Sequence, residues 1–134
     1  MVEKVFERVL RFQRLPIIRV GLITCRGNRR DIPMVFDTGA TTTVLRAEFA
    51  PLLGAATWTE GQQVPVDTVS GRATAYRFMA RLEVLGKVIE CPVHLMELPP
   101  NPLYGGLLGR EAIFERFGFG FWESTHELLV TANP

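Results

Sequence analysis

The chain has 134 residues, which is close to the commonest domain size and long enough for one hydrophobic core. Hydrophobic residues make up 47% of it and charged residues 22%, as in globular proteins. With 15 basic and 14 acidic residues the net charge is +1, which argues against nucleic acid binding, since a phosphate-binding surface needs clustered surplus charge.

The sequence shows no targeting or membrane segment. No run approaches the roughly 18 to 20 apolar residues of a membrane span. The N-terminus "MVEKVFERVLRFQRLP" is interrupted by charge and lacks the apolar core of a secretory signal. We therefore expect a cytoplasmic location and no membrane partner.

Cysteines and histidines give no metal-binding pattern. Cys25 and Cys91 are far apart in the sequence, and reduced thiols are favoured over a disulfide, which stays the alternative. His94 and His126 are isolated and are interpreted as structural or surface residues. We expect neither a metal nor a cofactor.

In chain order, the first 15 residues fit either a helix or a strand, and we treat 1–15 as a segment preceding a domain at 16–134. Most of that domain is β-branched or alternates in polarity, which predicts strands. The expected strands are 16–24, 34–39, 41–45, 62–71, 72–86, 87–98 and a final hairpin at 118–132 turning at Ser124 to His126.

The connections contain the residues typical of turns and short helices. A turn-like segment at 25–33 includes Asp31, and Ser70-Gly71 is expected to be a two-residue hairpin turn. Residues 46–55 predict a helical turn closed by Gly54, and "REAIFERF" at 110–117 predicts the best helix. The fold class is therefore all-β with one or two short helices.

The segment "PMVFDTGATTTVL", Pro33 to Leu45, places Asp37 inside an apolar run. A buried carboxylate is costly unless donors hold it. Gly39 lets the chain turn sharply so that backbone N–H groups approach the carboxylate, and Thr38 adds a hydroxyl. An ordinary Asx-turn at a strand end is the alternative interpretation of the triplet alone.

Two further segments make the interpretation of "MVFDTGATTTVL" more specific. "GGLLGREAIF" contains two apolar residues and a glycine before a predicted helix, and "VDTVSGRATAY" is a hairpin with a glycine at its tip. Together, in this order, the three segments resemble the retropepsin-like (retroviral-type) aspartic proteases. The resemblance covers roughly Pro16 to Val130, and the long C-terminal hairpin is more similar to the cellular or bacterial single-lobe members.

The resemblance implies a closed acid-protease β-barrel that acts as a homodimeric aspartic endopeptidase. It implies that Asp37 is catalytic, that Leu107-Leu108-Gly109 crosses the catalytic strand in a ψ-shaped loop, and that the hairpin is a flap over the substrate. The site residues it implies are Asp37 (catalytic), Thr38, Gly39 and Ala40 (active-site loop), Val69, Ser70 and Gly71 (flap), and Leu107, Leu108 and Gly109 (loop bracing and subsite wall).

The sequence departs from the viral pattern at Thr41 and Thr42, where viral enzymes often carry acidic residues. Arg110 therefore lacks its usual carboxylate partner, and a surface or interface role is expected for it. Val35, Val69, Leu103 and Leu108 are candidates for an apolar subsite wall.

Peptide hydrolysis by this chemistry needs two carboxylates that share one proton. Of the three aspartates, Asp31 and Asp67 are not followed by Thr/Ser-Gly. We therefore expect an obligate symmetric homodimer with one Asp37 from each chain. The resemblance implies that Thr38 bonds across the two-fold axis and that Gly39 contacts the substrate. Phe119, Phe121, Leu128 and Val130 are candidates for dimer strands.

Two other functions remain open. A catalytically silent retropepsin-fold module for dimerisation or peptide binding is the main alternative. A β-barrel that binds a ligand with Phe78, Trp58 and Trp122 is the other, although aromatic residues scattered singly are more often core. The basic "RGNRRD" segment is expected to be a solvated hairpin tip.

Overall fold

The computed structural model of the chain describes residues 8–101 and 103–132. In these residues the secondary structure is almost entirely strand, with two short 3₁₀ helices. The elements are β1 (Arg8–Arg11), β2 (Ile17–Ile23), β3 (Arg29–Phe36), β4 (Thr43–Arg46), η1 (Ala47–Leu53), η2 (Trp58–Glu60), β5 (Gln62–Thr68), β6 (Gly71–Val84), β7 (Lys87–Met96), β8 (Gly106–Leu108), β9 (Phe117–Trp122) and β10 (Glu127–Ala132).

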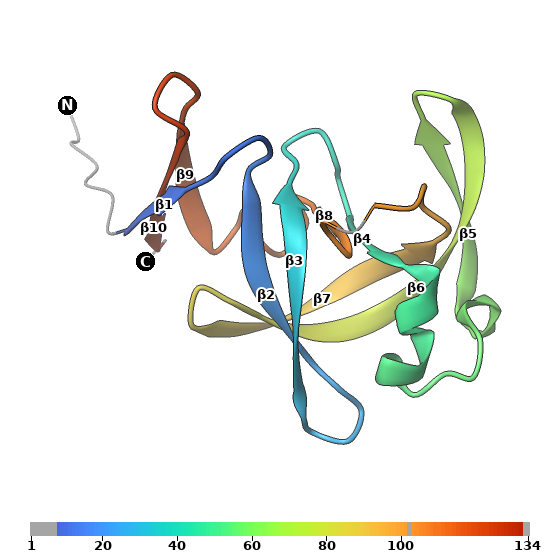
Figure 1. Cartoon of the computed structure of the whole chain (residues 1–134). Helices are drawn as coiled ribbons and strands as arrows, with labels where there is room; N and C mark the ends of the chain where they lie inside the picture. Colours follow the sequence, from blue (N-terminus) through green and yellow to red (C-terminus); the bar gives the residue numbers. More distant parts are fainter. Residues whose placement is uncertain (1–7, 102, 133–134) are drawn as a thin grey trace.

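Six strands close into a barrel. Each pairs with the next in the order β2-β3-β8-β4-β7-β6, and β2 also pairs with β6 to complete the ring. Closure leaves β5 outside the ring, where it pairs with the first half of β6 and forms a hairpin that projects from the barrel (Figure 1). The expected closed all-β barrel is thereby confirmed.

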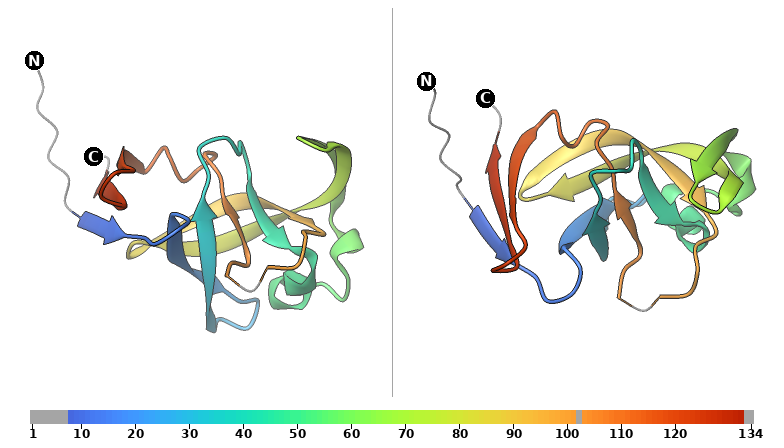
Figure 2. Two further views of the ribbon diagram at one scale, coloured as in Figure 1. Left: turned by 45° about the horizontal axis from the view of Figure 1, so that its top comes forward. Right: turned by 90° about the horizontal axis from the view of Figure 1, so that it is seen from above.

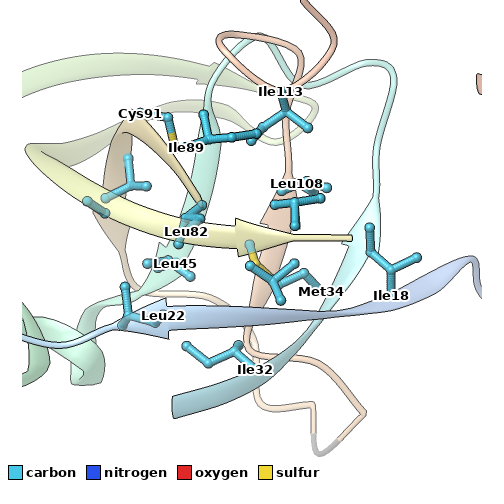
Figure 3. Close-up of a cluster of buried hydrophobic side chains, with 14 of the residues drawn as sticks. Ile18, Leu22, Ile32, Met34, Leu45, Leu82, Ile89, Cys91, Leu108 and Ile113 are labelled. Carbon is cyan, nitrogen blue, oxygen red and sulfur yellow. The ribbon is translucent and has the colours of Figure 1, made fainter. Parts of the chain in front are cut away.

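The barrel interior is filled by residues that alternate along the strands. Met34 on β3, Leu45 on β4 and Leu82 on β6 are no more than 1% exposed, and Figure 3 shows them pointing toward one another from different strands. Burial of each such side chain contributes about 1.5–3 kcal/mol. This core fixes the strand ends that carry the candidate site.

A separate sheet of three strands, in the order β1-β10-β9, stands at one end of the barrel, and the β5–β6 hairpin stands at the other (Figure 2). Leu128 and Val130 on β10 are 1% and 2% exposed because they join the main core. Their side chains are therefore covered by their own chain, and the expectation that this segment supplies dimer strands stays a prediction.

The ambiguous N-terminal segment contains β1 at Arg8–Arg11, which pairs with β10. The prediction for residues 1–7 lies outside the described residues.

The helix expected at 110–117 is wrong. Residues 111–116 form consecutive turns, and β9 begins at Phe117. Ala112 has a φ of 67°, a left-handed conformation that a continuous α-helix does not contain. The apolar spacing that suggested a helix instead lets Ile113, which is fully buried, close the end of the barrel.

Two turns differ in position from the expectation. The turn after β2 ends before Arg29, so Asp31 lies within β3 and pairs with Arg29 instead of lying in a turn. At the β5–β6 hairpin Thr68 pairs with Gly71, so the two turn residues are Val69 and Ser70. The helical turn closed by Gly54 is confirmed, with Gly54 in the left-handed region at φ 89°.

Within the described residues, no helix is long and apolar enough to cross a membrane. Cys25 and Cys91 are both free thiols; the first is exposed and the second buried.

Candidate active site

Asp37 follows the last residue of β3 and begins a tight turn. Its carboxylate Oδ1 accepts a hydrogen bond of 2.9 Å from the N–H of Gly39, and its carbonyl accepts one of 3.2 Å from Ala40. The Asp37 side chain is only partly buried in the single chain, so the expected burial inside an apolar run is wrong. Thr38 and Gly39 are exposed beside it.

The turn is braced by the segment that the sequence singled out at 107–109. Strand β8 passes between β3, which it pairs in parallel, and β4, which it pairs antiparallel. The Asp37 N–H donates to the carbonyl of Leu108 at 3.1 Å, and the Arg110 N–H donates to that of Ala40 at 3.0 Å. The chain thus forms a ψ-shaped crossing, with Asp37 directly after the end of β3.

A buried threonine holds the crossing together. The Thr43 hydroxyl, at a residue with 0% exposure, accepts a hydrogen bond of 3.0 Å from the N–H of Gly109. A Cβ on Gly109 would lie 2.5 Å from the carbonyl carbon of Thr42, so only glycine permits this approach. Sequence reasoning did not single out Thr43, because its partner lies 66 positions away.

A groove runs past Asp37 beneath the β5–β6 hairpin. Its volume is ≈ 900 Å³. Its floor contains Val44, His94 and Met96, and one wall is the hairpin from Pro65 to Ser70. The residues that line it are Asp37, Gly39–Thr42, Val44, Pro65–Ser70, Ala73, His94, Met96–Pro99 and Leu107.

The predicted flap residues lie at the hairpin tip. Val69 is fully exposed, with a relative exposure of 109%, and Val69 and Ser70 both line the groove. Gly71 has a φ of 115°, which favours glycine, and starts β6 beside them. Thr68 stabilises the turn, because its hydroxyl donates to the Gly71 carbonyl at 2.7 Å.

Of the expected wall residues, Val69 belongs to the groove, whereas Val35, Leu103 and Leu108 do not line it. Leu108 is fully buried in the barrel core instead. Leu107, one residue earlier on β8, faces the groove.

A second hollow, of ≈ 460 Å³, lies on the other side of Asp37. Asp37 and Thr38 form its edge, and most of its lining is aromatic. Phe36 stacks on Phe114 with ring centroids 5.1 Å apart, and Phe121 is 44% exposed. The residues that line it are Pro16, Phe36, Asp37, Thr38, Phe114, Phe117, Phe119, Gly120 and Phe121.

Polar residues that sequence reasoning missed support the groove wall. Glu111 accepts a hydrogen bond of 3.2 Å from the Thr42 hydroxyl and pairs with Arg77 at 3.8 Å. Arg77 and His94 are cross-strand partners. Burial lowers the pKa of His94, with Arg77 lowering it further and Glu111 opposing them, and His94 Nε2 has no hydrogen-bond partner among the described residues. Arg110 is exposed.

The three aromatic residues proposed as lining a ligand cavity do not form one. Phe78 and Trp58 pack against the core, and Trp58 meets Tyr76 edge-on at 5.0 Å. Trp122 is 54% exposed on β9. In the part of the chain that the structure describes, no group of three or more His, Cys, Asp or Glu side chains is arranged to hold a metal ion.

The geometry of Asp37, its turn and its crossing strand agrees with a match between the sequence and a known family. The family described as "Aspartyl protease" matches residues 23–112, which include the Asp37 turn, the hairpin and the bracing segment. The chain belongs to this aspartyl protease family. No curated protein sequence matches it.

Solved structures of aspartyl proteases share its fold. A retropepsin-like aspartic protease from Rickettsia conorii has 24% sequence identity and a TM-score of 0.62, over 96% of this chain and 100% of the other. The EIAV protease, solved with the inhibitor HBY-793, has 20% identity and a TM-score of 0.55, over 73% of this chain and 84% of the other. The retropepsin-like fold implied by the resemblance is therefore confirmed, and one of the similar structures is bacterial.

Proposed function

We propose that this aspartyl protease family member is an endopeptidase that hydrolyses peptide bonds with a water activated by two Asp37 carboxylates, one from each chain of a homodimer. The observation that carries the proposal is the position of Asp37 in a braced turn at the edge of a groove of ≈ 900 Å³ roofed by a hairpin. An extended peptide fits a groove of this kind, with its backbone groups available to both walls.

The chemistry needs one ionised carboxylate to accept a proton from water and one protonated carboxyl to polarise the scissile carbonyl. Two carboxylates in close contact do not both ionise, so the pair holds one proton between them, as is known for aspartic proteases. The Gly39 N–H would keep each carboxylate oriented through its hydrogen bond to Oδ1.

Neither of the other two aspartates suits this role. Asp31 is on β3 and pairs with Arg29 at 2.9 Å, while Asp67 is in the hairpin and pairs with Arg72 at 3.2 Å. We therefore infer that the partner of Asp37 is the Asp37 of a second chain. Thr38 is exposed beside Asp37, so its hydroxyl is accessible to a second subunit.

The other site residues take the roles that their positions favour. Gly39 and Ala40, which line the groove beside Asp37, would contact the substrate backbone, and Val69, Ser70 and Gly71 at the hairpin tip would close over it. Leu107 would contact substrate side chains, whereas Leu108 and Gly109 hold the Asp37 turn from behind. A cytoplasmic location and the domain boundary at residue 16 stay predictions.

Replacing Asp37 with asparagine tests the catalytic assignment. We expect Asp37→Asn to lower the rate of peptide cleavage by at least about 100-fold, since it removes general acid–base catalysis. Asp31→Asn is the matched control, because it makes the same substitution on β3, the strand that precedes Asp37, away from the groove. Cleavage of a peptide library would be read by mass spectrometry, with a statine-type inhibitor as a second control. Unchanged cleavage by Asp37→Asn would remove the assignment, and no cleavage by the parent would favour a silent binding module.

Mixing the parent with Asp37→Asn tests whether the pair spans two chains. After subunit exchange at equal amounts, random pairing leaves about a quarter of the dimers with two intact Asp37 residues. Activity should therefore fall to about a quarter of that of an all-parent sample at the same total concentration. A fall to only about half would mean that each chain acts independently and would overturn the shared pair of Asp37 carboxylates.

A further inference from the structure

Arg46, the last residue of β4, is a buried cation near the candidate active site. The residue is only 9% exposed, and arginine is seldom buried unless its charge is compensated. No carboxylate of the described residues forms an ion pair with it. The charge and the N–H donors of the guanidinium must therefore be compensated by groups other than carboxylates.

The compensation comes from one loop, residues 97–105 between β7 and β8. Arg46 Nε donates to the carbonyl of Tyr104 at 3.1 Å, and Nη1 donates to those of Leu98 at 3.3 Å and Pro99 at 3.0 Å. Nη2 donates to the carbonyl of Asn101 at 3.3 Å. The guanidinium also lies 5.6 Å from the centre of the Tyr104 ring.

This loop has few means of holding its own shape. Its described residues form neither helix nor strand, and Pro99 and Pro100 supply no backbone N–H. Leu103 donates to the Asn101 side chain at 2.9 Å and Gly105 donates to Pro33 at 2.8 Å. By contrast, the Arg46 side chain donates hydrogen bonds to four carbonyls of the loop.

The start of the loop is also part of the groove. Glu97, Leu98 and Pro99 line it together with Asp37. Leu98 packs against the small apolar cluster that includes Val44 and Met96, which form the groove floor. The two carbonyls nearest this wall, those of Leu98 and Pro99, are both bound by Arg46 Nη1.

We propose that Arg46 is a positioning residue that shapes one wall of the peptide groove by binding the carbonyls of the 97–105 loop. It acts through that loop and does not touch the reacting atoms. The kinetic consequence of this inference rests on the proposed peptidase function. The clamp, meaning the set of hydrogen bonds from Arg46 to the 97–105 loop, can be tested without any activity.

Lysine cannot make the same set of hydrogen bonds as Arg46, so Arg46→Lys is a suitable test variant. The guanidinium is planar and directs its N–H groups along fixed directions that reach carbonyls from residue 98 to residue 104. An ammonium group carries the same charge at a single point, so it can reach only part of this set. Arg46→Lys therefore preserves the charge and releases part of the loop.

The first measurement is amide hydrogen exchange, followed by mass spectrometry. We expect exchange in the 97–105 segment to be about tenfold faster in Arg46→Lys, because hydrogen bonds from a charged donor are lost, while β2 and β7 exchange as in the parent. Arg26→Lys, an exposed arginine in the turn after β2, is the matched control. Unchanged exchange in 97–105, or equal acceleration throughout the barrel, would overturn the clamp.

The second measurement is the KM and kcat of peptide cleavage. A released groove wall should raise KM about five- to twentyfold with kcat within about twofold of the parent, because binding is affected and Asp37 is not. Unchanged KM, or a loss confined to kcat, would overturn the role in the groove. If the parent cleaves no peptide, the proposed function fails, and the Kd of a statine-type peptide then replaces KM in deciding the inference.

Discussion

Replacing Gly109 with alanine is the most direct test of how the Asp37 turn is braced. A Cβ at this position would lie 2.5 Å from the carbonyl carbon of Thr42 and 2.7 Å from the N atom of Thr43. Both are backbone atoms of a neighbouring segment, so no side-chain rotation relieves the overlap. The two segments must separate, and the 3.0 Å hydrogen bond from Gly109 to the Thr43 hydroxyl is lengthened or broken.

The expected cost combines these two effects. Forcing an extra methyl group into a packed site costs about 1–3 kcal/mol, and the loss of a buried hydrogen bond adds about 1 kcal/mol. We therefore expect Gly109→Ala to lower the free energy of unfolding by about 2–4 kcal/mol. For a chain of this size the Tm should fall by about 6–16 °C.

Urea unfolding and thermal melting of the two proteins would measure this difference. Gly39→Ala is the matched control for stability, because its Cβ would meet only the Asp37 Oδ1, at 3.3 Å. It should change the unfolding free energy by less than about 1 kcal/mol. A Gly109→Ala protein within about 0.5 kcal/mol of the parent would refute the reasoning, since the crossing would then not be tightly packed.

Two further predictions concern titratable groups. Burial, with a smaller effect of Glu111, raises the pKa of Cys91 to about 12. A maleimide should therefore label the exposed Cys25 quickly and Cys91 only after unfolding. Rapid labelling of both thiols would contradict the burial of Cys91. Burial lowers the pKa of His94 from its ordinary value of 6.5. Below about pH 6.5 the unfolded chain therefore binds a proton at His94 more readily than the folded chain does, and the folded state loses stability as the pH falls. Between about pH 7.5 and 5.5 the parent should therefore lose more unfolding free energy than His94→Gln, and an equal loss would show that His94 does not contribute.

The sequence carried enough information to predict the barrel and the position of the candidate site. Strands such as "PIIRVGLIT" are recognisable by local composition, and the Asp37 turn and the 107–109 segment each contain a short pattern that does not depend on distant contacts. Gly54 was likewise predictable, because the left-handed cap at a helix end is a local requirement.

The remaining parts depend on contacts between residues far apart in the chain. Thr43 and Glu111 act through partners 66 and 69 positions away, and Arg46 through carbonyls more than 50 positions away. The false helix at 110–117 has the same origin. Its apolar spacing is genuine, but the N–H groups of Arg110 and Glu111 bond to the Asp37 loop, and Ala112 adopts a left-handed conformation.

The surroundings of Asp37 favour different partners on its two sides. The groove side includes the Gly39 backbone and the residues Thr41 and Thr42 beside lining that is largely apolar, so it suits both the amides and the apolar side chains of an extended peptide. The other side is the aromatic hollow, where Phe121 is 44% exposed. An apolar surface of that kind gains most from burial against another protein surface. We therefore expect a second copy to dock over the hollow, whose edge contains Asp37 and the exposed Thr38, because the proposed chemistry needs a second Asp37 there.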